Sequence, residues 1–247
     1  QDKLKFIYMN TDPNSWAPPR LPTLALQCDA KLGLAALADS LTGPRPSRAA
    51  QVKKVREWCE LQMREVQPQY EWTQSLRRAI PEDGILVQDL TQVCYYSRAF
   101  FPLYRPRTGI TPGHQGTLGY SYPTALGVAA ANPGRAVVCA SGDGGFGYGL
   151  ADLATAAKYK LGVVALVFND RQFSNIRNAH EAAFGKSTCY ELNNPDFGKL
   201  ADAFGVKSAL IRTPADLDRV LPAAIASGEP WLIDAQVGKM GDPWHLV

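Results

Sequence analysis

Several features that would assign a protein to a common class are missing from this chain of 247 residues. No apolar run approaches the roughly 18 residues of a membrane-spanning helix, and the start, Gln1 to Lys3, carries no apolar signal segment. An excess of charge of one sign is also missing, because the chain has 26 Lys and Arg and 23 Asp and Glu. We therefore expect a cytoplasmic protein with neither a membrane nor a nucleic acid as its partner.

Cysteine-based sites and the common hydrolase motifs are missing too. The chain has five cysteines, Cys28, Cys59, Cys94, Cys139 and Cys189. Their odd number and the lack of a CxxC pair argue against a disulfide framework and a zinc site. The chain has only three histidines and neither a GxSxG nor an HExxH motif. What remains is the composition of a globular protein, long enough for one large domain or two.

From about Pro68 onward, strand-like and helix-like stretches alternate. Strands are predicted near 85–88, 136–140, 163–168, 206–211 and 231–237. This alternation predicts an α/β fold with a doubly wound, mainly parallel sheet and helices on both faces. Between two of these strands, an apolar stripe at helical spacing is expected in the core: Leu150, Leu153, Ala154 and Ala157.

The first part of the chain has a different organisation. It contains, in order, a strand at 5–10, a Pro-rich loop, a strand at 24–27 and a helix at 31–41. Two prolines and a glycine make Gly43 to Ser47 the best linker candidate, and a polar helix follows it. We expect residues 1–43 to be the tail of one domain, 44–67 a linker with its helix, and 68–247 a second domain. Because a strand begins almost at once, we expect a longer polypeptide or one subunit of a split assembly.

The turn Gly142-Asp143-Gly144 closes the apolar run 136–140. A glycine-rich turn between a strand and a helix presents backbone N–H groups to an anion. A carboxylate in that turn would repel a phosphate unless a divalent cation lay between them, and Mg²⁺ accepts both carboxylate and phosphate oxygens. Asp170, after the next predicted strand, is the candidate second carboxylate.

A different interpretation of this turn is a dinucleotide-binding fingerprint. Residues 142–147 also satisfy GxGxxG, and Asp170 would then be the acid that binds the ribose. However, that fingerprint belongs to the first strand of its domain, whereas this turn follows an earlier strand at 85–88. The dinucleotide interpretation also gives Asp143 no role.

Asp143-Gly144, followed after 24 residues by Asn169-Asp170, resembles the thiamine-diphosphate motif GDG…NN. Further stretches are similar to the acetolactate synthase and benzoylformate decarboxylase group of thiamine-diphosphate enzymes: 89–92, 106–108, 116–120 and 168–177. The likeness covers roughly Pro68 to Trp244. It implies the diphosphate-binding domain of that group, preceded by a remnant of its Rossmann-like central domain.

The resemblance also implies a set of site residues. Asp143, Asp170 and the backbone carbonyl of Gln172 are the implied ligands of Mg²⁺, although this chain has Asn-Asp where the family commonly has Asn-Asn. The implied contacts to thiamine diphosphate are Thr91, Gln92, Gly116, Leu118, Asp143, Gly144, Gly145, Asp170 and Phe173. Leu118 falls where the family places a bulky residue under the thiazolium ring. Thr91 has the alternative role of a helix cap, and Gly116 and Leu118 that of turn and core residues.

The implied activity is the decarboxylation or carboligation of 2-keto acids, with a 2-keto acid or an aldehyde as substrate. The family activates its cofactor with a glutamate from a pyrimidine-binding domain, which has no counterpart in this chain, so that domain must come from a missing N-terminal part or another chain. We expect no catalytic residue in this chain beyond a substrate-facing role for His114. A dimer or tetramer is expected, since the family builds each site between two chains. Alternatives are a non-catalytic cofactor-binding or regulatory subunit and an NAD-dependent oxidoreductase.

Overall fold

The computed structural model describes residues 4–16, 20–113 and 115–241. The chain divides into two compact units, Gln1–Lys54 and Val55–Val247, which are described separately here. The boundary between them lies inside helix α2, Ala49–Arg64. Among the described residues, no helix combines the length and the apolar character needed to cross a membrane.

The first unit is built on two parallel strands, β1 (Ile7–Asn10) and β2 (Leu24–Gln27). A short 3-10 turn, η1 (Pro13–Ser15), lies between them, and α1 (Ala30–Ser40) follows. Asp29 caps α1, because its carboxylate accepts hydrogen bonds from the first backbone N–H groups of the helix. None of the residues of β1, β2 and α1 is fully buried.

A six-stranded parallel sheet forms the centre of the second unit, in the order β4-β3-β5-β6-β8-β7. Its strands are β3 (Ile85–Gln88), β4 (Gly109–Ile110), β5 (Val137–Gly142), β6 (Val163–Asn169), β7 (Lys207–Ile211) and β8 (Trp231–Gln236). Every residue of β3, β5 and β6 is buried, as expected for strands covered on both faces. The five predicted strands are confirmed, whereas the two-residue β4 was not anticipated.

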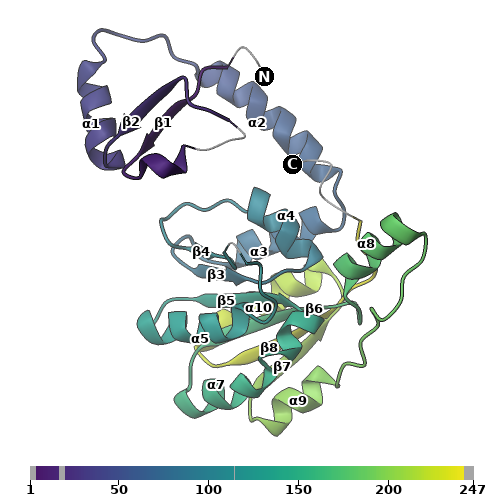
Figure 1. Ribbon diagram of the computed structural model, residues 1–247. Helices are drawn as coiled ribbons and strands as arrows, with labels where there is room; N and C mark the ends of the chain where they lie inside the picture. The colour runs from purple at the N-terminus through teal and green to yellow at the C-terminus, as the bar shows by residue number, and fades with distance from the viewer. Residues whose placement is uncertain (1–3, 17–19, 114, 242–247) are drawn as a thin grey trace. The chain divides into compact units, whose positions relative to one another are not determined.

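Helices cover both faces of this sheet (Figure 1). One face packs against α3 (Gln69–Ala79), α4 (Gln92–Phe100) and α10 (Pro214–Ser227), and the other against α5 (Ser121–Ala131), α7 (Leu153–Tyr159) and α9 (Phe197–Ala203). Successive strand residues alternate between the two cores, so Leu86 belongs to the first and Val87 to the second. The doubly wound fold predicted from the sequence is therefore confirmed.

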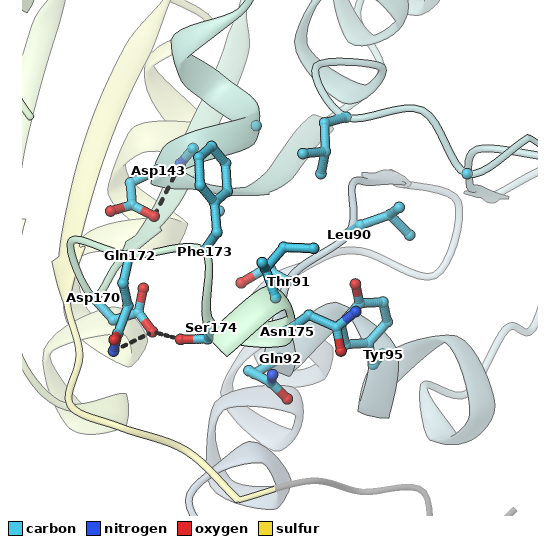
Figure 2. Close-up of a pocket in the computed structure, with 16 residues that line it drawn as sticks. Leu90, Thr91, Gln92, Tyr95, Asp143, Asp170, Gln172, Phe173, Ser174 and Asn175 are labelled. Atoms are coloured by element: carbon cyan, nitrogen blue, oxygen red, sulfur yellow. Dashed lines mark hydrogen bonds between the residues drawn. The ribbon is translucent and has the colours of Figure 1, made fainter. Parts of the chain in front are cut away.

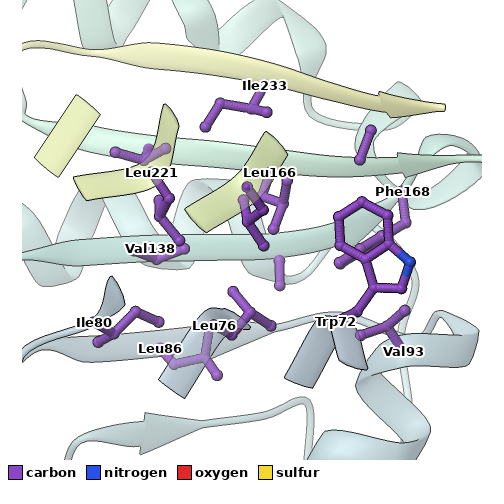
Figure 3. Close-up of a cluster of buried hydrophobic side chains, with 14 of the residues drawn as sticks. Trp72, Leu76, Ile80, Leu86, Val93, Val138, Leu166, Phe168, Leu221 and Ile233 are labelled. Atoms are coloured by element: carbon purple, nitrogen blue, oxygen red, sulfur yellow. The ribbon is translucent and has the colours of Figure 1, made fainter. Parts of the chain in front are cut away.

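The first of these cores centres on aromatic and aliphatic side chains from α3, α10 and the middle strands (Figure 3). Trp72 meets Phe168 edge to face, with ring centroids 5.4 Å apart. Phe168 is the penultimate residue of β6, so this contact fixes the end of that strand, where the chain turns toward Asp170. The apolar core thus holds the start of the loop that carries one of the predicted ligands.

The order of the strands creates a switch point between β3 and β5. From β3 the chain moves outward to β4 and then returns past β3 to form β5 on its other side. At such a point the connections leave the carboxyl ends of the two strands in opposite directions, which opens a crevice in which ligands of doubly wound folds bind.

Candidate functional site

A cavity of about 250 Å³ lies at the carboxyl ends of β3, β5 and β6. Figure 2 shows the residues that line it; most of them follow these three strands directly, whereas Gly116 and Leu118 come from the segment between β4 and α5. The lining includes all of the predicted cofactor-contacting residues, Thr91, Gln92, Gly116, Leu118, Asp143, Gly144, Gly145, Asp170 and Phe173, together with Gln172. The fold therefore brings together residues that lie up to 82 positions apart, from Thr91 to Phe173.

Of the three histidines, only His180 is among the residues that the structure describes. His114, the predicted substrate-facing residue, and His245 lie outside the described residues. His180 is on α8 (Ser174–Phe184), where its ring meets that of Phe184, and it is not part of the cavity lining. The lining does contain side chains to which the sequence had assigned no role, namely Leu90, Tyr95 and Ser174.

Asp143 is buried at the junction of β5 and the five-residue helix α6 (Asp143–Gly147). Its Oδ1 accepts a hydrogen bond from Gly144 N at 2.9 Å. Its Oδ2 accepts one from Arg171 N at 2.8 Å and another from the Asn194 amide at 2.5 Å. Burial raises the pKa of Asp143 from 3.8 to about 6, although the hydrogen bond from Asn194 opposes this effect.

Asp170 follows β6 and faces the same cavity. Its Oδ2 accepts hydrogen bonds from the Ser174 hydroxyl and, at 3.3 Å, from the Gln172 amide. Burial raises the pKa of Asp170 as well, and these hydrogen bonds lower it. The next residue, Arg171, has a left-handed backbone with φ of 59°, a conformation rare for side chains other than Gly and Asn, and this places its N–H on Asp143.

The two carboxylates repel each other, and the charge of Asp170 helps to raise the pKa of Asp143. No Lys or Arg is among the described residues that line the cavity. The buried Arg177 lies behind Gln172, to whose amide oxygen it donates at 2.6 Å. Two carboxylates without a cation in the wall are a donor set suited to a hard divalent cation. No group of three or more His, Cys, Asp or Glu side chains among the described residues could hold a metal, so a cation between these two carboxylates would need further ligands.

Space around the glycine-rich turn is limited at each glycine. A Cβ on Gly144 would lie 2.4 Å from Cε1 of Phe173, and one on Gly142 would lie 3.2 Å from the Thr91 side chain. A Cβ on Gly145 would lie 3.2 Å from Oδ2 of Asp89. The turn therefore requires glycine for close packing, and at Gly145 the neighbour is a buried carboxylate behind the cavity wall.

That carboxylate, Asp89, joins two parts of the site. It is completely buried at the end of β3. Its Oδ1 accepts from Leu90 N at 2.8 Å, and its Oδ2 accepts from Gly119 N at 3.0 Å and from both the N–H and the hydroxyl of Ser121. Gly119 has a φ of 77°, so the turn that carries Leu118 is held by a hydrogen bond at a position suited to glycine. The sequence showed only that Asp89 follows an apolar strand.

Thr91 and Gln92 begin α4. Thr91 occupies the N-cap position, but its side chain makes no capping hydrogen bond, so the simple cap interpretation does not account for it. Gln92 is 6% exposed, and its amide oxygen has no hydrogen-bond partner among the described residues. A buried polar atom without a partner in a cavity wall is satisfied by a water molecule or a ligand.

Residues 89–235 match the family described as "Thiamine pyrophosphate enzyme, C-terminal TPP binding domain". Thiamine pyrophosphate, abbreviated TPP, is another name for thiamine diphosphate. The match begins at Asp89 and ends on β8, so it includes every segment that lines the cavity.

Individual proteins show the same similarity. The chain is 33% identical over 158 residues to a probable acetolactate synthase large subunit of Methanococcus aeolicus, covering 63% of this chain and 26% of the relative. It is 31% identical over 186 residues to an acetolactate synthase of Arthrospira platensis, covering 68% and 32%. The chain thus spans about a quarter to a third of the length of these relatives.

The fold is also similar to a solved structure. A thiamine diphosphate-dependent 4-hydroxybenzoylformate decarboxylase of Rhodococcus jostii RHA1 superposes with a TM-score of 0.72 at 22% identity, over 95% of this chain and 44% of that one. At this identity the likeness concerns the fold alone.

Proposed function

Since the chain belongs to the thiamine pyrophosphate enzymes and carries their C-terminal TPP-binding domain, we propose that it serves a TPP- and Mg²⁺-dependent enzyme of the acetolactate synthase type. The proposed reaction is the decarboxylation of a 2-keto acid, its carboligation with a second carbonyl compound, or both. The proposed share of this chain is to anchor the diphosphate and the metal ion.

The observation that carries the proposal is the cation-poor cavity with two facing carboxylates. In the proposed arrangement, Asp143, Asp170 and the backbone carbonyl of Gln172 hold Mg²⁺, and diphosphate oxygens complete its coordination. Asp143 Oδ2 already accepts two hydrogen bonds, whereas Oδ1 accepts one, so Oδ1 is the atom we assign to the cation.

The remaining wall residues orient the cofactor. Thr91 and Gln92 are assigned to the far end of the diphosphate, where the unused threonine hydroxyl and the buried amide of Gln92 are available. Leu118 is assigned to the underside of the thiazolium and Gly116 to the aminopyrimidine. When bound, TPP would supply a nucleophilic carbon for the keto group and an electron-accepting ring for the loss of carbon dioxide. The protein supplies orientation and a site with little water, which raise the rate by prepositioning the reacting atoms.

This chain does not complete the proposed site. A pyrimidine-binding domain must supply the carboxylate that activates the cofactor, and we propose that it comes from another part of the polypeptide or from a second chain. A dimer or tetramer follows if each site is shared between two chains.

The direct test is an assay of carbon dioxide release and acetolactate formation from pyruvate, TPP and Mg²⁺. We expect product when residues 1–247 are assayed within an assembly that includes a pyrimidine-binding domain, and none when either TPP or Mg²⁺ is removed. Residues 1–247 alone should give no product, and turnover by them would contradict the proposed division of labour. Binding of NAD(H) without Mg²⁺, in place of TPP, would contradict the proposed function.

A further inference from the structure

Asn194 lies in the loop between α8 and α9. The pattern Asn194-Pro195-Asp196 is typical of a helix start, at which an asparagine can supply the cap. The structure shows that Asp196 is the cap, since its carboxylate accepts from Lys199 N at 3.1 Å. The side chain of Asn194 does not cap the helix, and it hydrogen-bonds instead to Asp143, a residue of the cavity wall.

The Asn194 amide donates to two acceptors on different strands. It donates to Asp143 Oδ2 at 2.5 Å and to Asn169 Oδ1 at 3.0 Å. Asp143 follows β5 and Asn169 ends β6, so one amide group spans the two turns that carry the proposed metal ligands.

The network continues to a third strand. Asn169 donates from Nδ2 to Asp234 Oδ1, on β8, at 3.0 Å, and both residues are more than nine-tenths buried. A carboxylate can only accept, so Asp234 determines which end of the Asn169 amide carries the N–H groups. The oxygen of Asn169 must then face Asn194, and the N–H groups of Asn194 face Asp143. Each amide is oriented by the next, from Asp234 toward the cavity.

The direction of these bonds matters for Asp143. Oδ2 is occupied by Asn194 and by Arg171 N, which lie on the protein side of the carboxylate. The carboxylate plane is thereby held with Oδ1 as the less occupied oxygen. Hydrogen bonds that fix a metal ligand from behind typically change metal affinity by 10- to 100-fold.

We propose that Asn194, oriented by Asn169 and Asp234, is a positioning residue that holds Asp143 ready for a divalent cation, an inference that rests on the proposed function. It ties the loop before α9, which does not line the cavity, to the affinity of the metal site. The expected signature is a loss of Mg²⁺ affinity with little change in kcat once Mg²⁺ is saturating.

The test is a titration of the assembled protein with Mg²⁺ at saturating TPP, followed by calorimetry. Asn194→Ala should weaken apparent Mg²⁺ affinity by about 10- to 100-fold. Asn193→Ala is the matched control, because Asn193 is an exposed asparagine in the same loop, and it should leave affinity within about twofold of wild type. The catalytic rate at saturating Mg²⁺ provides the second readout.

A second variant tests the direction of the network and does not depend on Asn194→Ala folding normally. Asp234→Asn keeps the shape of the side chain, but an amide can donate as well as accept, so it no longer fixes the orientation of the Asn169 amide. This variant should therefore also weaken Mg²⁺ affinity, as Asn194→Ala does. The double variant should lose little more Mg²⁺ affinity than Asn194→Ala alone, because the two residues act through the same hydrogen-bond network. Two results would overturn the inference and leave the proposed function standing, provided that the wild type binds Mg²⁺ and TPP. One is that the losses of Mg²⁺ affinity in the two variants are fully additive. The other is that Asn194→Ala binds Mg²⁺ as tightly as Asn193→Ala does. Absence of Mg²⁺-dependent TPP binding in the wild type would overturn the proposed function itself.

Discussion

Two buried aspartates, Asp89 and Asp143, follow neighbouring strands of the same sheet, yet their surroundings differ. Asp89 is fully buried and accepts hydrogen bonds from three backbone N–H groups and two hydroxyls, those of Ser121 and Ser141. Asp143 also accepts three hydrogen bonds, but it faces the cavity and a second carboxylate, Asp170. The donors around Asp89 come from the segment after β3, the turn at Gly119, the start of α5 and β5, so Asp89 links these parts of the fold.

The difference separates a structural carboxylate from one that we propose to bind a cation. A buried carboxylate surrounded by donors stabilises its environment, and removing it leaves those donors without partners. A buried carboxylate beside another carboxylate is held at a cost that a bound cation relieves. The same residue type at equivalent ends of β3 and β5 therefore supports the fold in one case and is proposed to bind metal in the other.

The largest expected effect comes from removing each carboxylate in turn. Asp89→Ala should lower the free energy of unfolding by about 3 kcal/mol or more, because Gly119 N and Ser121 N lose their acceptor. Asp143→Asn should lower the stability of the metal-free protein by at most about 1 kcal/mol, because removal of a repelled buried charge offsets the loss of an acceptor for one of its three N–H donors. Denaturant unfolding in EDTA at pH 7.5 would measure both changes.

Asp202→Ala is the control for these two variants, because Asp202 is exposed on α9. Its free energy of unfolding should change by less than about 0.5 kcal/mol. Equal destabilisation by Asp89→Ala and Asp143→Asn would remove the distinction between the two carboxylates.

A smaller effect is expected from a methyl group placed beside Asp89. Gly145→Ala should cost about 1–2 kcal/mol, because the new Cβ meets Oδ2 of Asp89 at 3.2 Å and disturbs its hydrogen bonds. Gly147→Ala, in the same short helix, has nothing within 4 Å of its Cβ and should be neutral. Thermal unfolding would measure both changes. Equal stability of the two variants would show that the space around Asp89 does not matter for stability.

Asp143 should make the stability of the metal-free protein depend on pH. Burial raises the pKa of Asp143 from 3.8 to about 6, so between these values the native metal-free protein holds a proton that the unfolded chain has released. The contribution of this group to stability is therefore present at low pH and is lost as pH rises through about 6. Metal binding has the opposite sign, because the ligand must be ionised: apparent Mg²⁺ affinity should fall about tenfold per pH unit below 6.

Unfolding and Mg²⁺ titrations at several pH values would measure this dependence. The metal-free Asp143→Asn variant should lose most of the stability trend. A variant that retains the full trend would assign the titration to another group.

The smallest effect is expected at the second carboxylate. Asp170→Asn keeps an oxygen ligand and relieves the repulsion with Asp143, so Mg²⁺-dependent TPP affinity should fall by less than about tenfold. Calorimetric titration of Asp170→Asn and Asp143→Ala with TPP in Mg²⁺ would show which substitution lowers the affinity more. A greater loss at Asp170 than at Asp143 would reverse the assigned importance of the two ligands.

The architecture and the clustering of the candidate site were predictable because both depend on local patterns. Continuous apolar runs identified the buried strands, and parallel strands place their carboxyl ends at one edge. The strand β4 has only two residues, too few for a periodic signal. The expected apolar stripe was wrong at Ala154, which is exposed, whereas Ala156 is buried. A 3-10 turn at Leu150–Asp152 precedes α7, and its tighter winding changes which residues face the core.

The hydrogen bonds behind the cavity could not be read from the sequence. Asn194 reaches Asp143 across 51 positions, and Asp89 reaches Ser121 across 32. Local patterns such as Asn-Pro-Asp indicate a helix start, and only the packing of the loop against β5 and β6 shows that Asn194 has a different partner. The proposed ligands were predicted from their spacing, whereas the residues that hydrogen-bond to them could not be predicted.

The central claim is that the turns after β5 and β6 hold the diphosphate through a divalent cation. Titration of the assembled protein with TPP, in Mg²⁺ and in EDTA, tests it most directly when wild type and Asp143→Ala are compared. The account predicts tight binding by the wild type in Mg²⁺ only, and at least about 100-fold weaker binding by Asp143→Ala. Equal TPP affinity in EDTA, or unchanged affinity in Asp143→Ala, would contradict it.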